Sequence, residues 1–126
     1  MSALAANSVD AVVVLVVEDE IFVRFDVAGC LEDAGYDVVE AATGEEAIAL
    51  CNSGTSIDMV ITDINLGGSA SGWDVAECCR TARPDLPVVY TSGKSIDPKR
   101  CVAGSIFMSK PYRHSDILDV CHRLTQ

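Results

Sequence analysis

The feature that most constrains the fold of this chain is a regular alternation of short apolar runs and amphipathic segments. The runs are rich in β-branched residues, and each has the length of one strand: residues 12–17, 36–40, 57–62, 88–90 and 105–108. In the segments between and after them, apolar residues recur at helical spacing. Strict alternation requires right-handed crossovers, so it predicts an α/β domain in which five helices cover both faces of a five-stranded parallel sheet.

Helix-start signals mark several of these segments. Thr43 and Glu46 have the spacing of a capping box, and residues 71–74 have the form of another helix start. An aspartate followed by proline at residues 97–98 fits an N-cap and first helical residue, but Gly104 limits this fourth helix to about six residues. The apolar stripe of the first helix is Ile21, Phe25, Ala28 and Leu31.

Length and charge limit the possible functions. At 126 residues the chain is long enough for one domain with its own core, which we place at residues 11–126 behind a flexible tail of residues 1–10. No apolar run near the N-terminus can span a bilayer and no secretory signal is recognisable, so we expect a cytoplasmic protein without a membrane partner. Nine basic against 19 acidic residues give a net charge of −10, which opposes binding to nucleic acid.

The chain contains six cysteines: Cys30, Cys51, Cys78, Cys79, Cys101 and Cys121. The absence of a Cys-x-x-Cys pair argues against a zinc site. Because several of them fall at apolar positions of predicted helices, we interpret most as small core residues. A redox-active adjacent pair, Cys78 and Cys79, is the alternative.

Carboxylates stand at the ends of two predicted strands. Asp63 follows the run 57–62, and Glu18 and Asp19 follow the run 12–17. If these strands lie parallel, the three carboxylates meet at one sheet edge, where they repel one another unless a cation lies among them. The pattern therefore predicts a divalent metal site that contains a reactive aspartate.

Other polar residues stand at equivalent places. Thr91 and Ser92 follow the fourth run, and Lys110 follows the fifth. Ligands of open parallel sheets bind beyond the carboxyl ends of the strands, so these residues are expected to converge on the same edge.

Four short motifs carry a family resemblance. They are residues 16–20 (Val-Val-Glu-Asp-Glu), 61–63 (Ile-Thr-Asp), 90–93 (Tyr-Thr-Ser-Gly) and 109–111 (Ser-Lys-Pro). In this order, on a (βα)5 pattern, they make the chain from Ala11 to Leu124 similar to the CheY-like receiver domain of two-component response regulators. The resemblance implies a flavodoxin-like, doubly wound sheet with strand order 2-1-3-4-5.

The resemblance also implies a site and its chemistry. A phosphohistidine of a sensor histidine kinase or a histidine phosphotransfer protein would donate its phosphoryl group to Asp63, with Mg²⁺ or Mn²⁺ as cofactor. The implied metal site comprises Glu18, through a water molecule, Asp19, Asp63 and the backbone carbonyl of Asn65. The implied switch and phosphate-binding residues are Thr91, Phe107 and Lys110. A cis peptide bond is expected before Pro111.

A stand-alone receiver of this kind would be a signalling module that catalyses only its own phosphorylation and dephosphorylation. It would act through a downstream protein partner, as a monomer or a weak phosphorylation-dependent dimer. The resemblance implies that kinase specificity lies around residues 22–27 and 111–114. Trp73 is expected to pack at the start of the third helix, and His114 and His122 are assigned no role.

The chain departs from the family pattern in three places. The loop at residues 66–72 is rich in glycine, so we predict that it is more mobile than usual. The short fourth helix puts the usual dimer contact in doubt. Gly93 leaves one side of the pocket open, which predicts access of water and a short-lived acyl phosphate.

Three other functions fit parts of the pattern. A degenerate receiver that acts as a phosphorylation-independent scaffold is opposed by the intact set of site residues. A Mg²⁺-dependent aspartyl phosphohydrolase of the haloacid dehalogenase class needs a second acid at the position of Asn65. A flavodoxin-like FMN binder is disfavoured because the loop after the first run is acidic, where a phosphate needs glycine and hydroxyl groups.

Overall fold

The structure, a computed structural model, describes residues 11–94 and 97–125. The tail predicted for residues 1–10 lies outside the described residues. In the described part of the chain, no helix has the length and apolar character needed to cross a bilayer.

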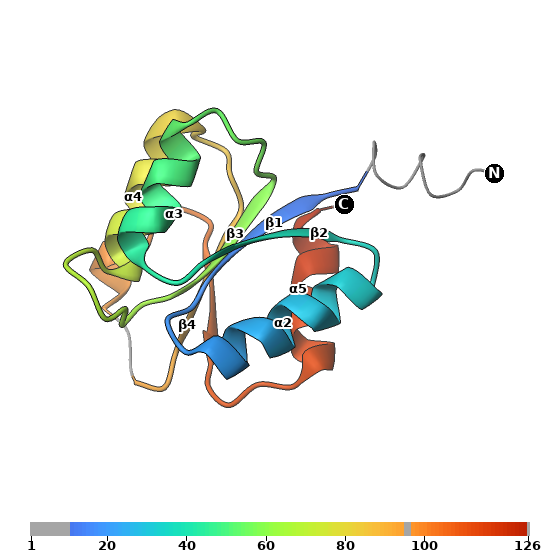
Figure 1. Ribbon diagram of the computed structural model, residues 1–126. Helices are drawn as coiled ribbons and strands as arrows, with labels where there is room; N and C mark the ends of the chain where they lie inside the picture. Colours follow the sequence, from blue (N-terminus) through green and yellow to red (C-terminus); the bar gives the residue numbers. More distant parts are fainter. Residues whose placement is uncertain (1–10, 95–96, 126) are drawn as a thin grey trace.

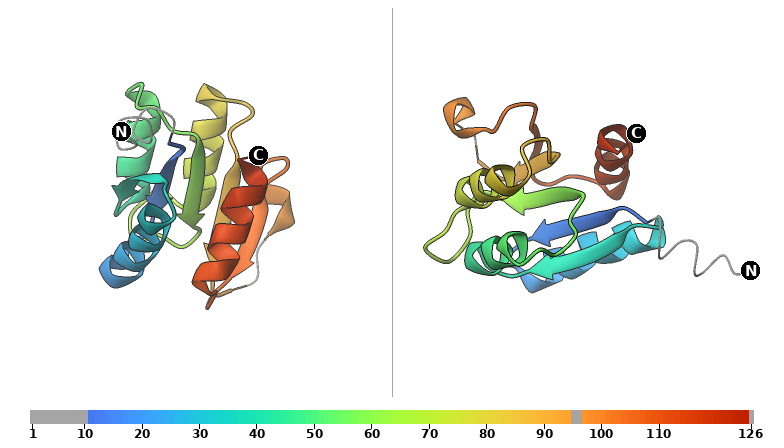
Figure 2. Two further views of the ribbon diagram at one scale, coloured as in Figure 1. Left: turned by 90° about the vertical axis from the view of Figure 1, so that its right-hand side faces the viewer. Right: turned by 90° about the horizontal axis from the view of Figure 1, so that it is seen from above.

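Five parallel strands form one sheet in the order β2-β1-β3-β4-β5, which confirms the predicted flavodoxin-like topology (Figures 1 and 2). The strands are β1 (Val13–Val17), β2 (Asp37–Ala41), β3 (Met59–Asp63), β4 (Val88–Ser92) and β5 (Ile106–Ser109). Strands β3 and β4 are buried along their whole length, as expected where helices cover both faces of a parallel sheet.

Within residues 11–94 and 97–125, four α-helices lie in two layers, one on each face of the sheet. The helices are α2 (Ile21–Asp33), α3 (Gly44–Asn52), α4 (Gly72–Ala82) and α5 (His114–Leu124). Helices α2 and α5 pack against one face through a cluster that includes Leu31 and Ile117, whereas α3 and α4 pack against the other through Ala47 and Val75 (Figure 1). Two hydrophobic layers therefore hold the sheet, and its carboxyl edge carries the polar residues.

The predicted fourth helix of about six residues is wrong. In its place the described chain contains a single 3-10 turn, η1 (Pro98–Arg100). The predicted start is present, because Asp97 Oδ1 accepts a hydrogen bond from the Lys99 amide at 3.0 Å. The turn ends early because Cys101 is extended and the Val102 amide donates to the Tyr90 hydroxyl at 3.1 Å instead of to a helical carbonyl.

The other predicted helix starts are confirmed. Thr43 caps α3 by accepting from the Glu46 amide at 3.1 Å, and Glu46 Oε1 accepts from the Ala42 amide. Ser71 and Asp74 form a complete capping box at the start of α4. Both helices therefore begin where side chains satisfy their free amides.

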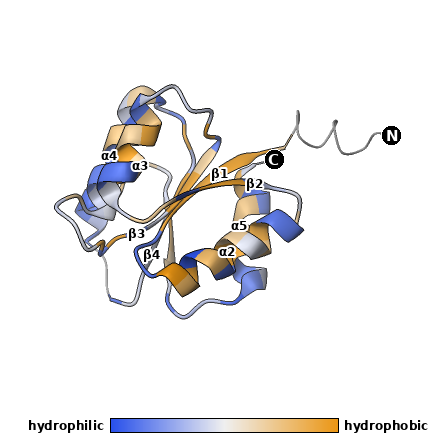
Figure 3. Cartoon of the chain, in the orientation of Figure 1, coloured by the Kyte–Doolittle hydropathy of each residue, from blue (hydrophilic) through white to orange (hydrophobic). Residues whose placement is uncertain are grey.

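The predicted apolar stripe of α2 is only partly buried. Ala28 and Leu31 face the core together with Val27, but Ile21 and Phe25 are largely exposed. The buried face of α2 is therefore formed by Val27, Ala28 and Leu31, and Ile21 and Phe25 lie at the edge of this face, in contact with solvent. Figure 3 shows hydrophobic residues at the solvent-exposed first turns of α2.

The interpretation of most cysteines as small core residues did not include a disulfide bond between two of them. A disulfide bond joins Cys51 of α3 to Cys79 of α4. Cys121 is a free buried thiol, and burial raises its pKa to about 12, so it behaves as a core residue. The alternative of a redox-active pair of Cys78 and Cys79 is not formed, since Cys78 is a free thiol and Cys79 is bonded to Cys51.

Candidate functional site

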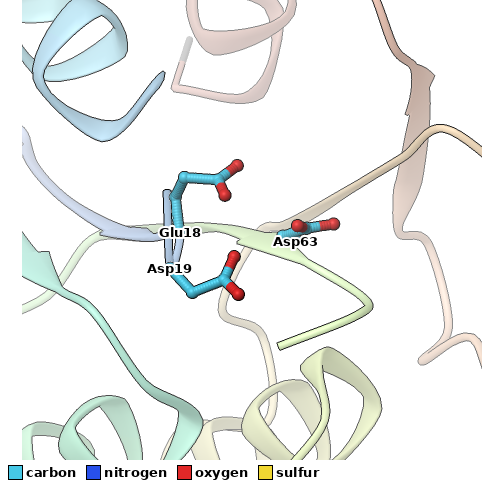
Figure 4. A group of neighbouring side chains, drawn as sticks. All are labelled: Glu18, Asp19 and Asp63. Atoms are coloured by element: carbon cyan, nitrogen blue, oxygen red, sulfur yellow. The ribbon is translucent and has the colours of Figure 1, made fainter. Parts of the chain in front are cut away.

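Three carboxylates gather at the carboxyl edge of the sheet. One oxygen each of Glu18, Asp19 and Asp63 lies within 4.8 Å of the others (Figure 4). Strands β1 and β3 are parallel neighbours with Val17 opposite Thr62, so the residues that follow Val17 come level with the end of β3. Glu18 and Asp63 are only 4% and 7% exposed, whereas Asp19 is open to solvent.

Lys110 connects two of these carboxylates. Its Nζ donates to Glu18 Oε1 at 2.9 Å and to Asp63 Oδ2 at 3.1 Å. The backbone of β5 is placed by the hydrogen bond from the Lys110 amide to the Ser92 carbonyl at 2.8 Å, and the predicted cis bond before Pro111 is present. The ammonium group therefore lies between acids that come from two other strands.

Burial and charge oppose each other at these groups. Burial raises the pKa of Glu18, and the hydrogen bond from Lys110 only partly offsets this effect. Burial lowers the pKa of Lys110, but its hydrogen bonds to Glu18 and Asp63 outweigh burial and raise the pKa overall. Burial thus favours the neutral form of Glu18, while the two carboxylates keep Lys110 charged.

The donor set fits a hard divalent cation. Three carboxylates and one ammonium group have a formal charge of −3 + 1 = −2, which a divalent cation balances. Carboxylate oxygens suit Mg²⁺ or Mn²⁺, whereas no cysteine or histidine belongs to the cluster that would favour zinc. Asn65 is exposed two residues beyond Asp63, and its part in the site stays a prediction.

The predicted switch residues lie on neighbouring strands. Thr91 is buried on β4 as the register partner of Asp63, and the Ile64 amide donates to the Thr91 carbonyl at 3.0 Å. Phe107 on β5 is the partner of Tyr90, and it is half-buried against the cluster that contains Tyr90. Thr91 therefore borders the acidic site directly, while Phe107 lies toward α4.

Sequence analysis overlooked the role of Tyr90. Its ring lies 4.9 Å from the ring of Trp73, which packs at the start of α4 as predicted. The guanidinium of Arg100 lies 5.8 Å from the Trp73 ring and forms an ion pair with Glu77 at 3.3 Å. Together with the bond from the Val102 amide, these contacts fasten η1 to α4. A tyrosine in a fully buried strand was the available signal, because its hydroxyl needs a partner.

The loop after Asp63 is anchored by Glu45, at the start of α3. Glu45 Oε2 accepts from the Ser69 amide at 3.0 Å and also from the Ser69 hydroxyl. A Cβ at Gly68 would lie 2.7 Å from Glu45 Oε1, and one at Gly72 would overlap the Asp63 carbonyl oxygen. Glycine at these positions therefore permits close approach, in addition to the predicted mobility, which stays a prediction.

An apolar cavity of about 610 Å³ adjoins Lys110. It lies between α2 and the segment after β5, and its lining residues are Phe22, Val23, Asp26, Val27, Lys110, Pro111 and Tyr112. Beside it, His114 Nε2 lies 2.8 Å from Asp26 Oδ2, a contact that sequence analysis did not foresee. Burial raises the pKa of Tyr112 to about 12.

Comparison with known proteins supports the resemblance. The family model described as the response regulator receiver domain matches residues 14–122. The crystal structure of a response regulator receiver protein from Sinorhizobium medicae is similar to the chain, with 33% identity and a TM-score of 0.89. That alignment covers 92% of this chain and 95% of the other.

Two curated relatives are considerably longer than this chain. Transcriptional regulatory protein PdtaR from Mycobacterium tuberculosis is 31% identical over 109 residues, which cover 83% of this chain and 52% of that protein. Sensor kinase CckA from Brucella abortus is 34% identical over 85 residues, which cover 67% of this chain and 9% of the kinase. The chain thus spans about half of the former and a small part of the latter.

Proposed function

The chain belongs to the response regulator receiver domain family, and on this basis we propose that it is a phosphoryl acceptor in a two-component system. Asp63 receives the phosphoryl group from a phosphohistidine on a sensor histidine kinase or a histidine phosphotransfer protein. The observation that carries the proposal is the group of Glu18, Asp19 and Asp63 with Lys110 bonded to two of its members.

The acceptor oxygen belongs to a carboxylate that is nearly buried. As Asp63 attacks phosphorus, the bond from phosphorus to the histidine nitrogen breaks and the histidine retains its electron pair. Asp19, Asp63 and Asn65, with Glu18 through a water molecule, would hold a divalent cation, which would supply charge that offsets repulsion between Asp63 and the phosphoryl oxygens. The Lys110 ammonium, already 3.1 Å from Asp63, donates to a transferred phosphoryl oxygen.

The signal leaves the site through the neighbouring strand. The Thr91 hydroxyl moves to bond the new phosphoryl group, and Phe107 enters the space that Thr91 leaves. The support for this step is that Thr91 is the register partner of Asp63 and that Phe107 lies on the next strand. The surface around α4 and η1 then changes its affinity for a protein partner.

The donor protein docks beside Lys110. Phe22 is 80% exposed and Phe25 57% exposed on α2, next to the apolar cavity that extends to Lys110. An exposed apolar group of this kind, adjoining the acceptor site, suits a partner helix that brings its phosphohistidine to Asp63. The chain acts in this way as a cytoplasmic signalling module whose only catalysis is its own phosphorylation and dephosphorylation.

The test is phosphorylation of the full chain by acetyl phosphate with Mg²⁺, followed by intact-mass measurement. We expect one phosphoryl group on the wild type, none on Asp63→Asn, and none when a chelator removes the metal. Asp33→Asn, an exposed carboxylate at the end of α2, is the matched control and should be labelled like the wild type.

Two results would decide against the proposal. Full labelling of Asp63→Asn would show that Asp63 is not the acceptor. A wild-type chain that binds a partner but resists every phosphodonor would favour the phosphorylation-independent scaffold.

A further inference from the structure

The disulfide between Cys51 and Cys79 has no part in the proposed phosphoryl transfer. It joins the last turn of α3 to the last turn of α4, across 28 residues of chain. The two helices lie side by side on one face of the sheet (Figure 1). The bond is therefore a covalent link between two elements that hydrophobic packing already holds together.

The bond can be reached from solvent. A cavity of about 250 Å³ lies beside it, and its lining residues are Cys51, Gly54, Thr55, Ile57, Cys79, Ala82, Arg83 and Leu86. Cys79 is buried but Cys51 is only half-buried, so a small reductant meets the bond from the side of Cys51. The guanidinium of Arg83 also lines the cavity, where it forms ion pairs with Asp58 at 3.5 Å and Asp85 at 3.4 Å.

A third sulfur lies at the same junction. Cys78 is a free, half-buried thiol next to Cys79, and its Sγ lies 3.7 Å from Asn52 Oδ1, the residue after Cys51. The thiol and the disulfide therefore occupy the same contact between α3 and α4.

The linked helices also hold the loop that follows Asp63. Glu45 in the first turn of α3 accepts from the Ser69 amide, and Gly44 is in close contact with Ala70. Ser71 caps α4 immediately after that loop. A change in how tightly α3 and α4 are joined therefore reaches the backbone next to the acidic site.

We propose that Cys51 and Cys79 form a redox-responsive site, in which thiol–disulfide exchange in the folded protein switches a covalent link between α3 and α4 and thereby changes the order of the loop at residues 66–71. The reductant is a dithiol, either a small molecule or a protein, and the oxidant is a low-molecular-weight disulfide.

The exchange proceeds in two balanced steps. A thiolate of the dithiol attacks the Cys51 sulfur, the bond between the two protein sulfurs breaks, and Cys79 leaves as a thiolate that takes up a proton. The second thiol of the reductant then attacks the mixed disulfide and releases Cys51, which is also protonated. The protein gains two electrons and two protons, and the dithiol becomes a disulfide.

The experiment treats the native full-length chain with dithiothreitol or oxidised glutathione, blocks free thiols with iodoacetamide, and locates the labels by tandem mass spectrometry. We expect Cys51 and Cys79 to be labelled only after reduction, without urea and with an unchanged circular dichroism spectrum. Hydrogen exchange at residues 66–71 should accelerate roughly fivefold or more on reduction.

Two variants serve as controls. In the double variant Cys51→Ala, Cys79→Ala, hydrogen exchange of the loop should be as fast as in the reduced wild type under every condition. Cys30→Ser should respond to reduction like the wild type. The proposal is overturned if both cysteines remain alkylatable after oxidation, or if reduction occurs only at urea concentrations that unfold the chain. Equal loop exchange in the oxidised and reduced forms would also overturn it. All these measurements are independent of phosphorylation.

Discussion

The hydroxyl of Tyr90 offers a sharp test of how η1 is held. Tyr90 is fully buried on β4, and its hydroxyl accepts from the Val102 amide at 3.1 Å. Burial raises the pKa of Tyr90, so the hydroxyl remains protonated at neutral pH. Tyr90→Phe removes this one acceptor and keeps the ring that lies 4.9 Å from Trp73.

The stability that Tyr90→Phe should lose can be estimated from this single hydrogen bond. Without the hydroxyl, a partly buried backbone amide loses its partner, which costs about 1–2 kcal/mol. At about 2.1 cal/mol/K per residue, unfolding 126 residues has an entropy of roughly 0.26 kcal/mol/K, so a loss of about 1.5 kcal/mol lowers Tm by about 6 °C. Because the aromatic pair is unchanged, the structural change should be confined to the segment from η1 to β5.

Urea unfolding can be followed by the fluorescence of Trp73, the single tryptophan. Hydrogen exchange of the Val102 amide then reports the local effect, which should be faster in Tyr90→Phe. Tyr36→Phe is the matched control, because the Tyr36 hydroxyl has no hydrogen-bond partner among the described residues. If Tyr90→Phe loses no more stability than Tyr36→Phe, the hydrogen bond does not hold η1 and the reasoning is refuted.

Three further changes probe the surroundings of the site. Gly72→Ala should destabilise the chain by about 1–3 kcal/mol and reduce labelling by acetyl phosphate, because its Cβ overlaps the Asp63 carbonyl oxygen, whereas Gly29→Ala, in open space, should do neither in the same assays. Hydrogen bonds from the loop after β3, chiefly from Ser69, lower the pKa of Glu45. The contribution of Glu45 to stability is therefore present above its unfolded pKa and is lost as pH falls through its folded pKa. Glu45→Gln should remove this pH dependence from the hydrogen exchange of the loop. Burial raises the pKa of Tyr112 to about 12, so its stabilising contribution is complete below about pH 10 and is lost as pH rises toward 12; an ultraviolet titration of Tyr112→Phe should lack this late transition.

The site was largely predictable because the signals are local. Runs of β-branched residues identify strands, and strict alternation with helices predicts a parallel sheet whose carboxyl edge collects the residues that follow each strand. For this reason Glu18, Asp19, Asp63 and Lys110 were expected together, and the structure brings the three carboxylates within 4.8 Å of one another and bonds Lys110 to Glu18 and Asp63. Capping residues such as Thr43 act on their own helix, so their effects were also readable from the chain.

The sequence by itself therefore determined the strands, their alternation with helices and the acidic edge, since periodicity and capping act over a few residues. Only the tertiary structure decided the bond from Cys51 to Cys79, the anchoring of Ser69 by Glu45, and the bond from Val102 to Tyr90 that replaces a fourth helix. These partners lie 12 to 28 residues apart, on different elements. Such contacts depend on how helices and strands are placed relative to one another, which side-chain packing fixes and no local pattern encodes.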